Sequence, residues 1–383
     1  MNQQNLILTS TKEMSRDEWL EWRKPLFHVK KKIADSLYGT GFDLQDDLSL
    51  TPSKYKYDIL VQFFQSNGWI NFDFPCVGSS EMFALLMQND YLSATELYYT
   101  KVGAWEKPNI DNAAMFWGRE HEAQIADKWQ YWDGNQEGMI ANYTAGTIVR
   151  KCRRLNAYAQ NKKYPWIFVS ADRIINKTDT SAEGLLECKT ISGYAADQWE
   201  AGFPPYYIFQ IQTAIGCIEL AYGESAILKD GREMEVLPFD KSEALFEAII
   251  TKSKSFYEDV KKGIEFYLLS LVAPDEETRA MNYACMERLS PEIDGSIAMS
   301  DFLKVKNQDK GYETKGTEEE YEWAKKYEEL SAQLKPIETE KNLYANKIKD
   351  AMGEASTLSF GENGKVTWKE NVKKSRVFKV SLK

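Results

Sequence analysis

The chain has 383 residues, of which 43% are hydrophobic and 28% charged, and its formal net charge is −10 at pH 7. This composition is that of an ordinary globular protein, and the length allows about two to three domains. The negative net charge argues against a protein that coats nucleic acid broadly, although it leaves room for a local basic channel. No apolar run reaches the roughly 18 residues of a membrane span. Because residues 1–19 also lack the features of a signal peptide, we expect a cytoplasmic protein without membrane contact.

The cysteines and histidines of the chain limit which metal ions it could bind. The cysteines are odd in number, are scattered, and form no CxxC pair. They are Cys76, Cys152, Cys188, Cys217 and Cys285. This spacing is typical of reduced core thiols rather than of a zinc or iron–sulfur site. His28 and His121 are the only histidines, so a metal site would have to use carboxylates, which favours Mg²⁺ or Mn²⁺.

The first part of the chain is predicted to be mainly helical. Three stretches favour helices: 15–36, 55–64 and 109–132. The first has a capping box formed by Ser15 and Glu18. The third has Asn and Asp residues that can cap its start and an apolar face that includes Trp117, Trp129 and Trp132. We expect these tryptophans in the hydrophobic core rather than stacked on nucleic-acid bases.

Residues 166–192 are predicted to form a β-hairpin that holds candidate catalytic residues. Asp172 follows one apolar run, and Glu187 and Lys189 close another. If the hairpin turns symmetrically at residues 178–181, Asp172 faces Glu187. Lys189 then lies on the same side as Glu187, because side chains two apart on a strand share a face. Two carboxylates and an ammonium group would converge there, which is enough to hold Mg²⁺ against a phosphodiester.

The second part of the chain is predicted to alternate between helices and short strands. Helices are expected at 206–221, at 241–271 and, split near Pro336, at 317–353; strands are expected at 225–239 around Asp230-Gly231 and in the tail 357–380. Residues 272–316 are predicted to be irregular. The elements together indicate an α/β fold in which helices flank a mixed sheet.

The candidate site combines residues from the hairpin and from the helix before it. Asp172 and Glu187 are the expected metal ligands, with the carbonyl oxygen of Cys188 as a third donor and Glu122 able to join from its helix. A cation next to Lys189 would lower the pKa of its ammonium group, which could then orient or deprotonate the attacking water. A salt bridge on an exposed hairpin is the alternative interpretation of this pattern.

A basic cluster lies just before the hairpin, where a DNA backbone would need it. It consists of Arg150, Lys151, Arg153 and Arg154. A solvated charged loop is the alternative interpretation.

Five motifs occur in an order that resembles the PD-(D/E)XK nuclease superfamily, and within it phage lambda exonuclease and the YqaJ-like viral recombinases. They are SRDEWLEWR ending at Arg23; GSSE at 78–81, followed by LSATEL and KVG; AMFWGREHE at 114–122; SAD at 170–172 with ECK at 187–189; and PPYY leading to QIQ at 204–212. The resemblance covers residues 15–240. It implies a restriction-endonuclease-like core over 78–275, an N-terminal helical segment with an insert over 1–77, and a C-terminal α/β extension over 276–383.

The resemblance also implies roles for individual residues. Asp172, Glu187 and Glu122 resemble the family's metal ligands, and Lys189 resembles the lysine that activates water. Either Gln210 or Gln212 resembles the glutamine that orients the catalytic groups, and we favour Gln210.

Three further residues resemble the pocket that binds the 5′-phosphate of a DNA end: Arg23, Ser80 and Ser170. Ser80 opens a predicted helix, whose free N–H groups suit a phosphate, and arginine binds phosphate in a bidentate manner. One departure from the family concerns Arg23, because residues 24–77 separate it from the serine turn. Arg23 reaches the pocket only if this insert loops out.

The activity that the resemblance implies is a Mg²⁺-dependent, 5′→3′ double-strand DNA exonuclease of phage or prophage recombination in a bacterial host. Such an enzyme produces 3′ single-stranded tails for a strand-annealing partner, and its relatives are homo-oligomers that form trimeric rings. Two alternatives remain open at this stage. One is an endonuclease or RecB-like nuclease of the same superfamily, and the other is a catalytically inactive protein that only binds DNA.

Overall fold

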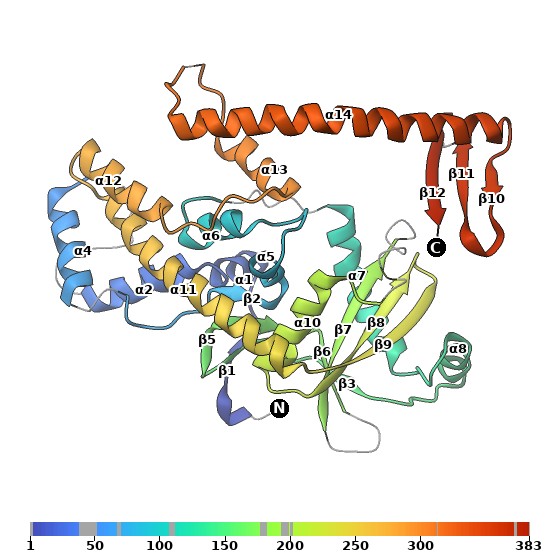
Figure 1. Ribbon diagram of the computed structural model, residues 1–383. Helices are drawn as coiled ribbons and strands as arrows, with labels where there is room; N and C mark the ends of the chain where they lie inside the picture. Colours follow the sequence, from blue (N-terminus) through green and yellow to red (C-terminus); the bar gives the residue numbers. More distant parts are fainter. Residues whose placement is uncertain are drawn as a thin grey trace. The chain divides into compact units, whose positions relative to one another are not determined.

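The computed structural model divides into two compact units, Met1–Gln308 and Asp309–Lys383 (Figure 1). It describes residues 3–37, 52–66, 70–106, 112–176, 182–192, 199, 202–311, 313–370 and 374–382. Among these residues, no helix is both long enough and apolar enough to cross a membrane.

A mixed five-stranded sheet forms one part of the first unit. Its strands, in spatial order, are β3 (Cys152–Arg153), β6 (Arg173–Asn176), β7 (Glu183–Ile191), β8 (Tyr222–Lys229) and β9 (Glu233–Asp240). Strands β7 and β8 are parallel, and the other neighbours are antiparallel. The parallel pair requires a crossover connection, which contains α10 (Pro205–Cys217).

A second sheet has four strands. Their spatial order is β1 (Leu6–Ser10), β4 (Ala157–Asn161), β5 (Tyr164–Ser170) and β2 (Val77–Gly78), with β2 parallel to β5. The chain leaves β5 at Ser170 and enters the five-stranded sheet at Arg173. Asp172 therefore lies at the junction between the two sheets.

Helices surround both sheets of the first unit. They are α1 (Arg16–Trp22), α2 (Pro25–Leu37), α4 (Lys54–Ser66), α5 (Phe83–Leu86), α6 (Ala94–Val102), α7 (Ala113–Trp129), α8 (Gln136–Ala145), α10, α11 (Glu243–Leu271), α12 (Glu276–Glu287) and α13 (Ile297–Lys306), with short 3₁₀ turns η1 (Gln3–Asn5) and η2 (Ser79–Glu81). The predicted α/β fold, a mixed sheet flanked by helices, is confirmed.

Strand β7 separates two hydrophobic clusters, which determines where its side chains point. Leu185 belongs to the larger core, together with residues of α10 and α11. Leu186 and Cys188 belong to a second core, together with residues of α7 and α8. Because side chains alternate along a strand, Glu187 and Lys189 point to the same side as Leu185, toward α10.

The predicted helix over 15–36 is present but broken. Ser15 and Glu18 form the expected capping box at the start of α1, and α2 begins at Pro25. The break falls at residues 23–24 because a proline disfavours helical backbone in the residue before it. This break turns Arg23 out of the helix.

The prediction of irregular structure over 272–316 is wrong, since α12 and α13 lie there. Each helix begins at a capping residue, Asp275 and Ser296, whose side chain accepts a backbone N–H bond. Helix α12 buries only Asn282 and Met286, so its apolar periodicity is weak.

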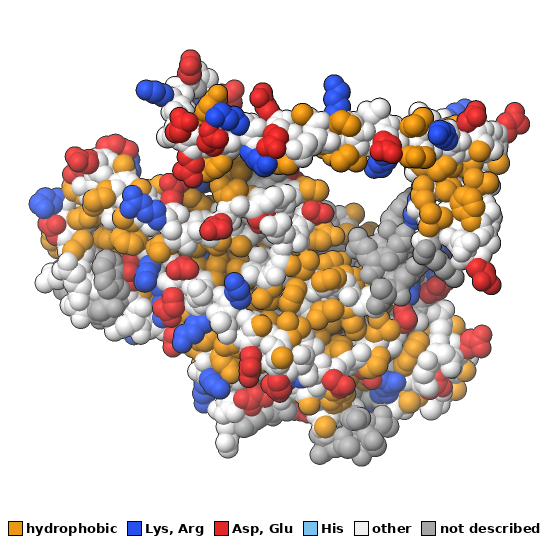
Figure 2. All heavy atoms as spheres, in the orientation of Figure 1, with side chains coloured by type: hydrophobic (Ala, Val, Ile, Leu, Met, Phe, Trp, Pro, Cys, Tyr) orange, Lys and Arg blue, Asp and Glu red, His pale blue; other side chains and the backbone are white. Residues whose placement is uncertain are grey.

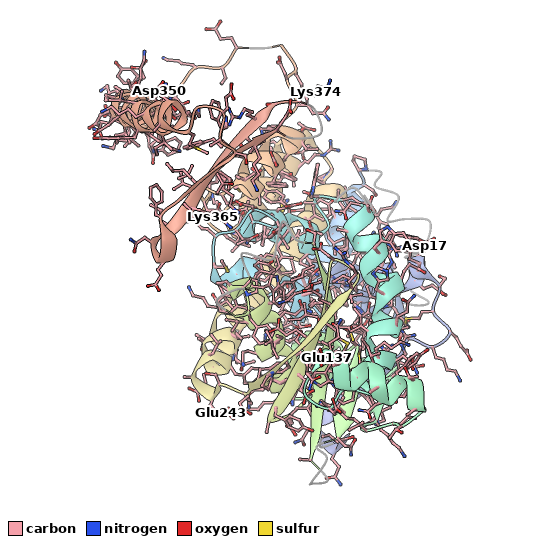
Figure 3. All side chains as sticks on the ribbon, turned by 90° about the vertical axis from the view of Figure 1, so that its right-hand side faces the viewer. Asp17, Glu137, Glu243, Asp350, Lys365 and Lys374 are labelled. Atoms are coloured by element: carbon pink, nitrogen blue, oxygen red, sulfur yellow. The ribbon has the colours of Figure 1, made fainter. Side chains whose placement is uncertain are left out.

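The second unit consists of one long helix and a small antiparallel sheet. The helix is α14 (Glu318–Met352), and the strands are β10 (Thr357–Ser359), β11 (Gly364–Glu370) and β12 (Arg376–Leu382), with the 3₁₀ turn η3 (Gly361–Asn363) after β10. The predicted strands of the tail are confirmed. Hydrophobic side chains recur along α14 in Figure 2, and Lys365 and Lys374, labelled in Figure 3, lie at opposite ends of the β11–β12 pair.

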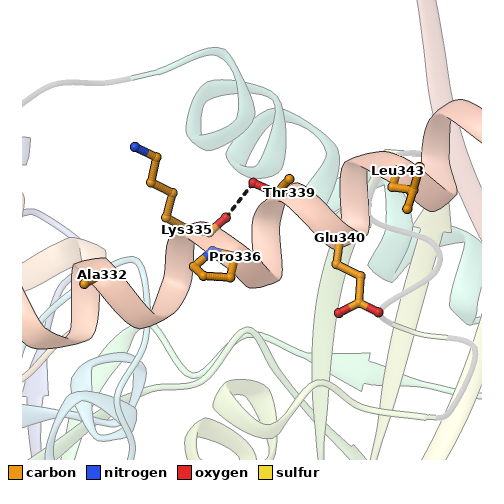
Figure 4. Close-up of a pocket in the computed structure, with 6 residues that line it drawn as sticks. All are labelled: Ala332, Lys335, Pro336, Thr339, Glu340 and Leu343. Carbon is orange, nitrogen blue, oxygen red and sulfur yellow. Dashed lines mark hydrogen bonds between the residues drawn. The ribbon is translucent and has the colours of Figure 1, made fainter.

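The predicted split of this helix near Pro336 is wrong, because α14 continues through the proline. Pro336 has no backbone N–H and so removes one hydrogen bond of the helix, but a side chain in the next turn forms an additional hydrogen bond to the backbone. The Thr339 hydroxyl donates to the carbonyl oxygen of Lys335 at 2.8 Å (Figure 4).

Candidate active site

The β6–β7 pair brings Asp172 and Glu187 together. Arg173 is paired with Leu186 in this ladder, so the same register places Asp172 opposite Glu187, as the sequence predicted. The predicted turn at 178–181 lies outside the described residues. Asp172 is held in place by the chain itself, since its Oδ2 accepts a hydrogen bond from the backbone N–H of Cys188 at 2.8 Å.

Glu187, Lys189 and Gln210 form a hydrogen-bonded triangle. Glu187 Oε1 accepts bonds from Lys189 Nζ and from Gln210 Nε2, both at 2.6 Å. Lys189 Nζ also donates to Gln210 Oε1 at 3.4 Å and lies 4.7 Å from the centre of the Tyr207 ring. Since Glu187 is only 4% exposed, these contacts hold a carboxylate away from bulk water.

The electrostatics of this cluster favour a bound cation. Burial raises the pKa of Asp172 well above its usual range, and the neighbouring Glu187 charge raises it further. Burial opposes the charged form of Lys189, but Glu187 and Tyr207 favour it more strongly, so the pKa of Lys189 is raised. Two carboxylates that share a buried position gain most from a positive charge between them.

The oxygen donors fit Mg²⁺, although they are few. Mg²⁺ keeps several waters and is often held by one or two carboxylates together with substrate phosphates. Asp172 and Glu187 supply that number, and Cys188 follows Glu187 in the same strand. Within the described residues, no three acidic, histidine or cysteine side chains gather into a ready-made metal cluster.

Glu122 is engaged elsewhere in this structure. Its Oε1 accepts bonds from Arg173 at 2.6 Å and from Arg154 at 3.1 Å. Arg173 follows Asp172 in the chain, so its side chain points to the opposite face of the sheet. It is paired with Leu186 on the face that α7 covers. Glu122 therefore lies beside the hairpin, paired with arginines rather than grouped with Glu187.

The two glutamines of α10 occupy different surroundings. Gln210 contacts Glu187 and Lys189, as described above. Gln212 instead joins β9 to α11, because its Nε2 donates to the carbonyl oxygen of Asp240 and its Oε1 accepts from the N–H of Ser242, both at 2.8 Å.

A second polar cluster forms around the turn at residues 78–81, and Arg23 reaches it despite the insert. Arg23 Nη2 lies 3.4 Å from Glu81 Oε1, and Lys101 Nζ lies 2.7 Å from Glu81 Oε2. Both cations also lie over the Phe168 ring, at 5.5 Å and 5.7 Å from its centre. The exposed Ser80 is next to Glu81 in the chain.

The packing of β2 against β5 explains why a glycine begins this turn. Gly78 is paired with Phe168, and a Cβ atom at Gly78 would lie only 3.0 Å from the Phe168 ring. Ser170 is exposed and shares a face of β5 with Phe168, because the two residues are two apart. Strand β5 therefore contributes both Phe168, which packs against the cations of the cluster, and Ser170, which is predicted to bind phosphate.

No role for Lys101, another member of this cluster, was predicted from the sequence. It is 3% exposed, which is rare for lysine unless it is paired. Its place in the KVG motif at the end of α6 was visible in the sequence, but its partner Glu81 could be recognised only from the fold.

Most of the basic cluster at 150–154 is occupied by acidic partners. Arg150 lies 2.5 Å from Glu224, Arg153 lies 2.6 Å from Glu183, and Arg154 lies 3.1 Å from Glu122. Lys151 is exposed.

The prediction that all three tryptophans of the 109–132 stretch lie in the core is wrong for Trp117. Trp129 and Trp132 are buried, but Trp117 is 55% exposed. Its indole stacks on His121, with 5.3 Å between the ring centres. The helical period explains the difference, because Trp117 and Trp129 are twelve residues apart and point about 120° away from each other around the helix axis. Trp129 lies on the side of the buried Ile125. Asn112 is the cap of this helix; the other candidates, Asn109 and Asp111, lie outside the described residues.

Comparisons with known proteins agree with the ordered motifs. Residues 68–220 match the family model of the YqaJ-like viral recombinase domain. The uncharacterized protein YqaJ of Bacillus subtilis (strain 168) is 22% identical over 300 residues, which cover 76% of this chain and 80% of that relative. The resemblance to YqaJ-like recombinases is thereby confirmed.

Solved structures also match part of the chain. An alkaline exonuclease (LHK-Exo) from Laribacter hongkongensis matches with a TM-score of 0.38 and 20% identity, over 50% of this chain and 90% of the exonuclease. The same exonuclease in complex with dAMP matches with a TM-score of 0.37 and the same identity and coverage.

Proposed function

From a chain whose residues 68–220 match the YqaJ-like viral recombinase domain, we propose a deoxyribonuclease that acts in phage or prophage recombination. The observation that carries this proposal is the triangle of Glu187, Lys189 and Gln210 beside Asp172. It combines the buried carboxylate of Glu187 with the partly buried carboxylate of Asp172, one ammonium group and one amide. Phosphodiester hydrolysis requires this equipment: ligands for a divalent cation and groups that position a water.

Each of these side chains has its own role in the proposed reaction. Asp172 and Glu187 would hold Mg²⁺ or Mn²⁺, and a cation bound there would supply positive charge for the phosphoryl oxygens and for a nucleophilic water. Lys189 Nζ would orient the attacking water, and its amine form, which a neighbouring cation would favour, would accept the proton of that water. Gln210 fixes the positions of Glu187 and Lys189 through its amide, which can donate and accept at once.

The cluster around Glu81 supports a 5′→3′ polarity for the proposed reaction. Arg23 and Ser80, with Ser170 on β5, form a pocket for a 5′-phosphate, and Lys101 adds a second positive charge. A phosphate held there would place the 5′ end of one strand near Asp172, because β5 leads directly into the Asp172 junction. The enzyme is then a 5′→3′ double-strand exonuclease whose product is a 3′ single-stranded tail.

A role in recombination also implies which proteins the enzyme would act with. The tail would be taken up by a single-strand annealing protein, and the enzyme would act as a homo-oligomeric ring around the duplex. A ring would explain how a chain with a net charge of −10 retains DNA, since exposed cations such as Lys151 could face its channel. A cytoplasmic location in the bacterial host accompanies this role.

Digestion of end-labelled linear duplex tests the proposal. We expect release of mononucleotides from 5′-phosphorylated ends with Mg²⁺, none with EDTA, and slower release from 5′-hydroxyl ends. Ser80→Ala and Arg23→Ala should reduce the preference for the 5′-phosphate, whereas Lys229→Ala, which removes a surface cation paired with Glu235, should not change it. Cleavage of covalently closed circles would favour an endonuclease instead. Binding of DNA ends without cleavage in any divalent cation would favour an inactive DNA-binding protein.

A further inference from the structure

The helix α14 has almost no packing partner within its own unit. Every residue from Glu318 to Tyr344 is exposed, and Met352 is the one residue of the helix that is buried. Most helices in proteins are stabilised by packing of an apolar face rather than by intrinsic propensity, and the internal Pro336 weakens this one further. A helix of this length therefore needs a contact that its own unit does not supply.

The apolar residues of α14 form a regular seam. We define the seam as Trp323, Tyr327, Leu330, Leu334, Ile337 and Tyr344, which are between 52% and 74% exposed. Their spacing alternates between four and three residues, and the one gap in the pattern is filled by Lys341. A 3.5-residue repeat sustained over about three heptads is the signature of a coiled coil. Figure 2 shows hydrophobic side chains at intervals along this helix.

The size of the seam suits a stable contact. An enclosed aromatic side chain buries about 150–250 Å², so the three aromatic residues of the seam, at roughly two thirds exposure, offer on the order of 400 Å² together. That is about half of the roughly 800 Å² that each partner contributes to a standard interface. The aliphatic residues supply most of the remainder.

The residues that flank the seam distinguish between arrangements of two such helices. In a parallel, in-register pair the flanking contacts join Lys326 to Ser331, Gln333 to Glu338 and Glu340 to Ala345 of the other copy, and none of them places like charges together.

An antiparallel pair in which Tyr327 lies opposite Tyr344 of the other copy would oppose Lys326 and Lys347, which repel each other. A single lysine at a seam position, here Lys341, is a device that fixes register at some cost in stability.

We propose that α14 is a parallel, in-register coiled-coil segment that joins copies of this chain through the seam. The occupant of the seam is thus a second copy of the same helix. This surface lies in the second unit, and its role does not depend on whether the first unit cleaves DNA.

Cysteine cross-linking of the full-length chain tests the arrangement. Leu330→Cys places a thiol in the seam, where a parallel, in-register pair brings the two copies of residue 330 face to face. Ala332→Cys places a thiol on the same helix but outside the seam and serves as the matched control. The unmodified chain reports any background from the native cysteines.

We expect mild oxidation to convert most of Leu330→Cys to a two-chain species on a non-reducing gel, with at least tenfold less for Ala332→Cys. Adding Leu334→Glu to Leu330→Cys should abolish the cross-link, because it buries a charge in the seam. Equal cross-linking of the seam and control variants, or no cross-linking of Leu330→Cys, would overturn the proposal. The second outcome would leave the seam to a helix of another protein.

Discussion

Glu81 joins two cations that come from distant parts of the chain, and its removal should be costly. Its carboxylate lies 2.7 Å from Lys101 Nζ and 3.4 Å from Arg23 Nη2 and accepts from the N–H of Gly78 at 2.8 Å. Burial acts to raise the pKa of Glu81, but Lys101 and Arg23 together lower it below its ordinary value of 4.5. Removing one partner of a buried ion pair costs about 3–5 kcal/mol, and we expect Glu81→Gln to lower the free energy of unfolding by about 3 kcal/mol.

A double-mutant cycle of Glu81→Gln with Lys101→Met measures the interaction between these two side chains. Each variant is unfolded in urea at pH 7 and followed by tryptophan fluorescence, and an m-value of about 3 kcal/mol/M turns the expected loss into a midpoint lower by about 1 M. The double variant should lose at least about 2 kcal/mol less than the sum of the single variants, because it no longer leaves the buried ammonium group of Lys101 without its carboxylate. Additive losses would refute the coupling between Glu81 and Lys101.

The pH dependence of the same variant has a definite sign. A carboxyl whose pKa is lowered by folding contributes stability that is fully present above its ordinary pKa and is lost as the pH falls through the folded value. The difference between the natural chain and Glu81→Gln should therefore shrink as the pH is lowered from about 5 to about 3. A difference that stays constant would show that the charge of Glu81 is not its cause.

Three further predictions concern other residues. Gln210→Ala should lower kcat by about 10²-fold with little change in melting temperature, whereas Gln212→Ala should lose two backbone bonds and about 2 kcal/mol of stability; the reverse pattern would contradict the placement of both. Burial raises the pKa of Glu265 to about 7, so stability falls as the pH rises from 4.5 toward 7, and Glu265→Gln should gain about 2–3 kcal/mol above pH 7 and nothing near pH 4.5 in urea titrations. Trp117→Ala should change stability by less than about 0.5 kcal/mol and Trp129→Ala by about 3–5 kcal/mol, and comparable losses would contradict their different burial.

Much of the fold could be predicted because its signals are local. The capping box at Ser15, the Asp230-Gly231 turn and the apolar run of α10 act over a few residues, and each lies where the sequence predicted it. The elements that were missed depend on tertiary context. Helix α12 has little apolar periodicity, and the continuation of α14 through Pro336 could not be inferred from a residue that usually ends helices.

The candidate site could be predicted in part for a similar reason. Asp172 and Glu187 belong to one hairpin, so the strand period alone places them opposite each other. The contacts of Glu122 and Lys101 are non-local, since they depend on how α7 and α6 pack. Their partners, Arg173 and Glu81, could not be recognised before the fold was known.

The most direct test compares the natural chain with Lys189→Met in Mg²⁺, using initial rates of nucleotide release from a 5′-phosphorylated linear duplex. Thermal melting and DNA-binding affinity are measured on both, so that a loss of rate can be separated from a loss of fold or binding. If Lys189 positions and deprotonates the attacking water beside Glu187, kcat should fall by at least about 10³-fold while affinity for the duplex stays within a few fold. A Lys189→Met variant that releases nucleotides at a rate close to that of the natural chain would contradict this site.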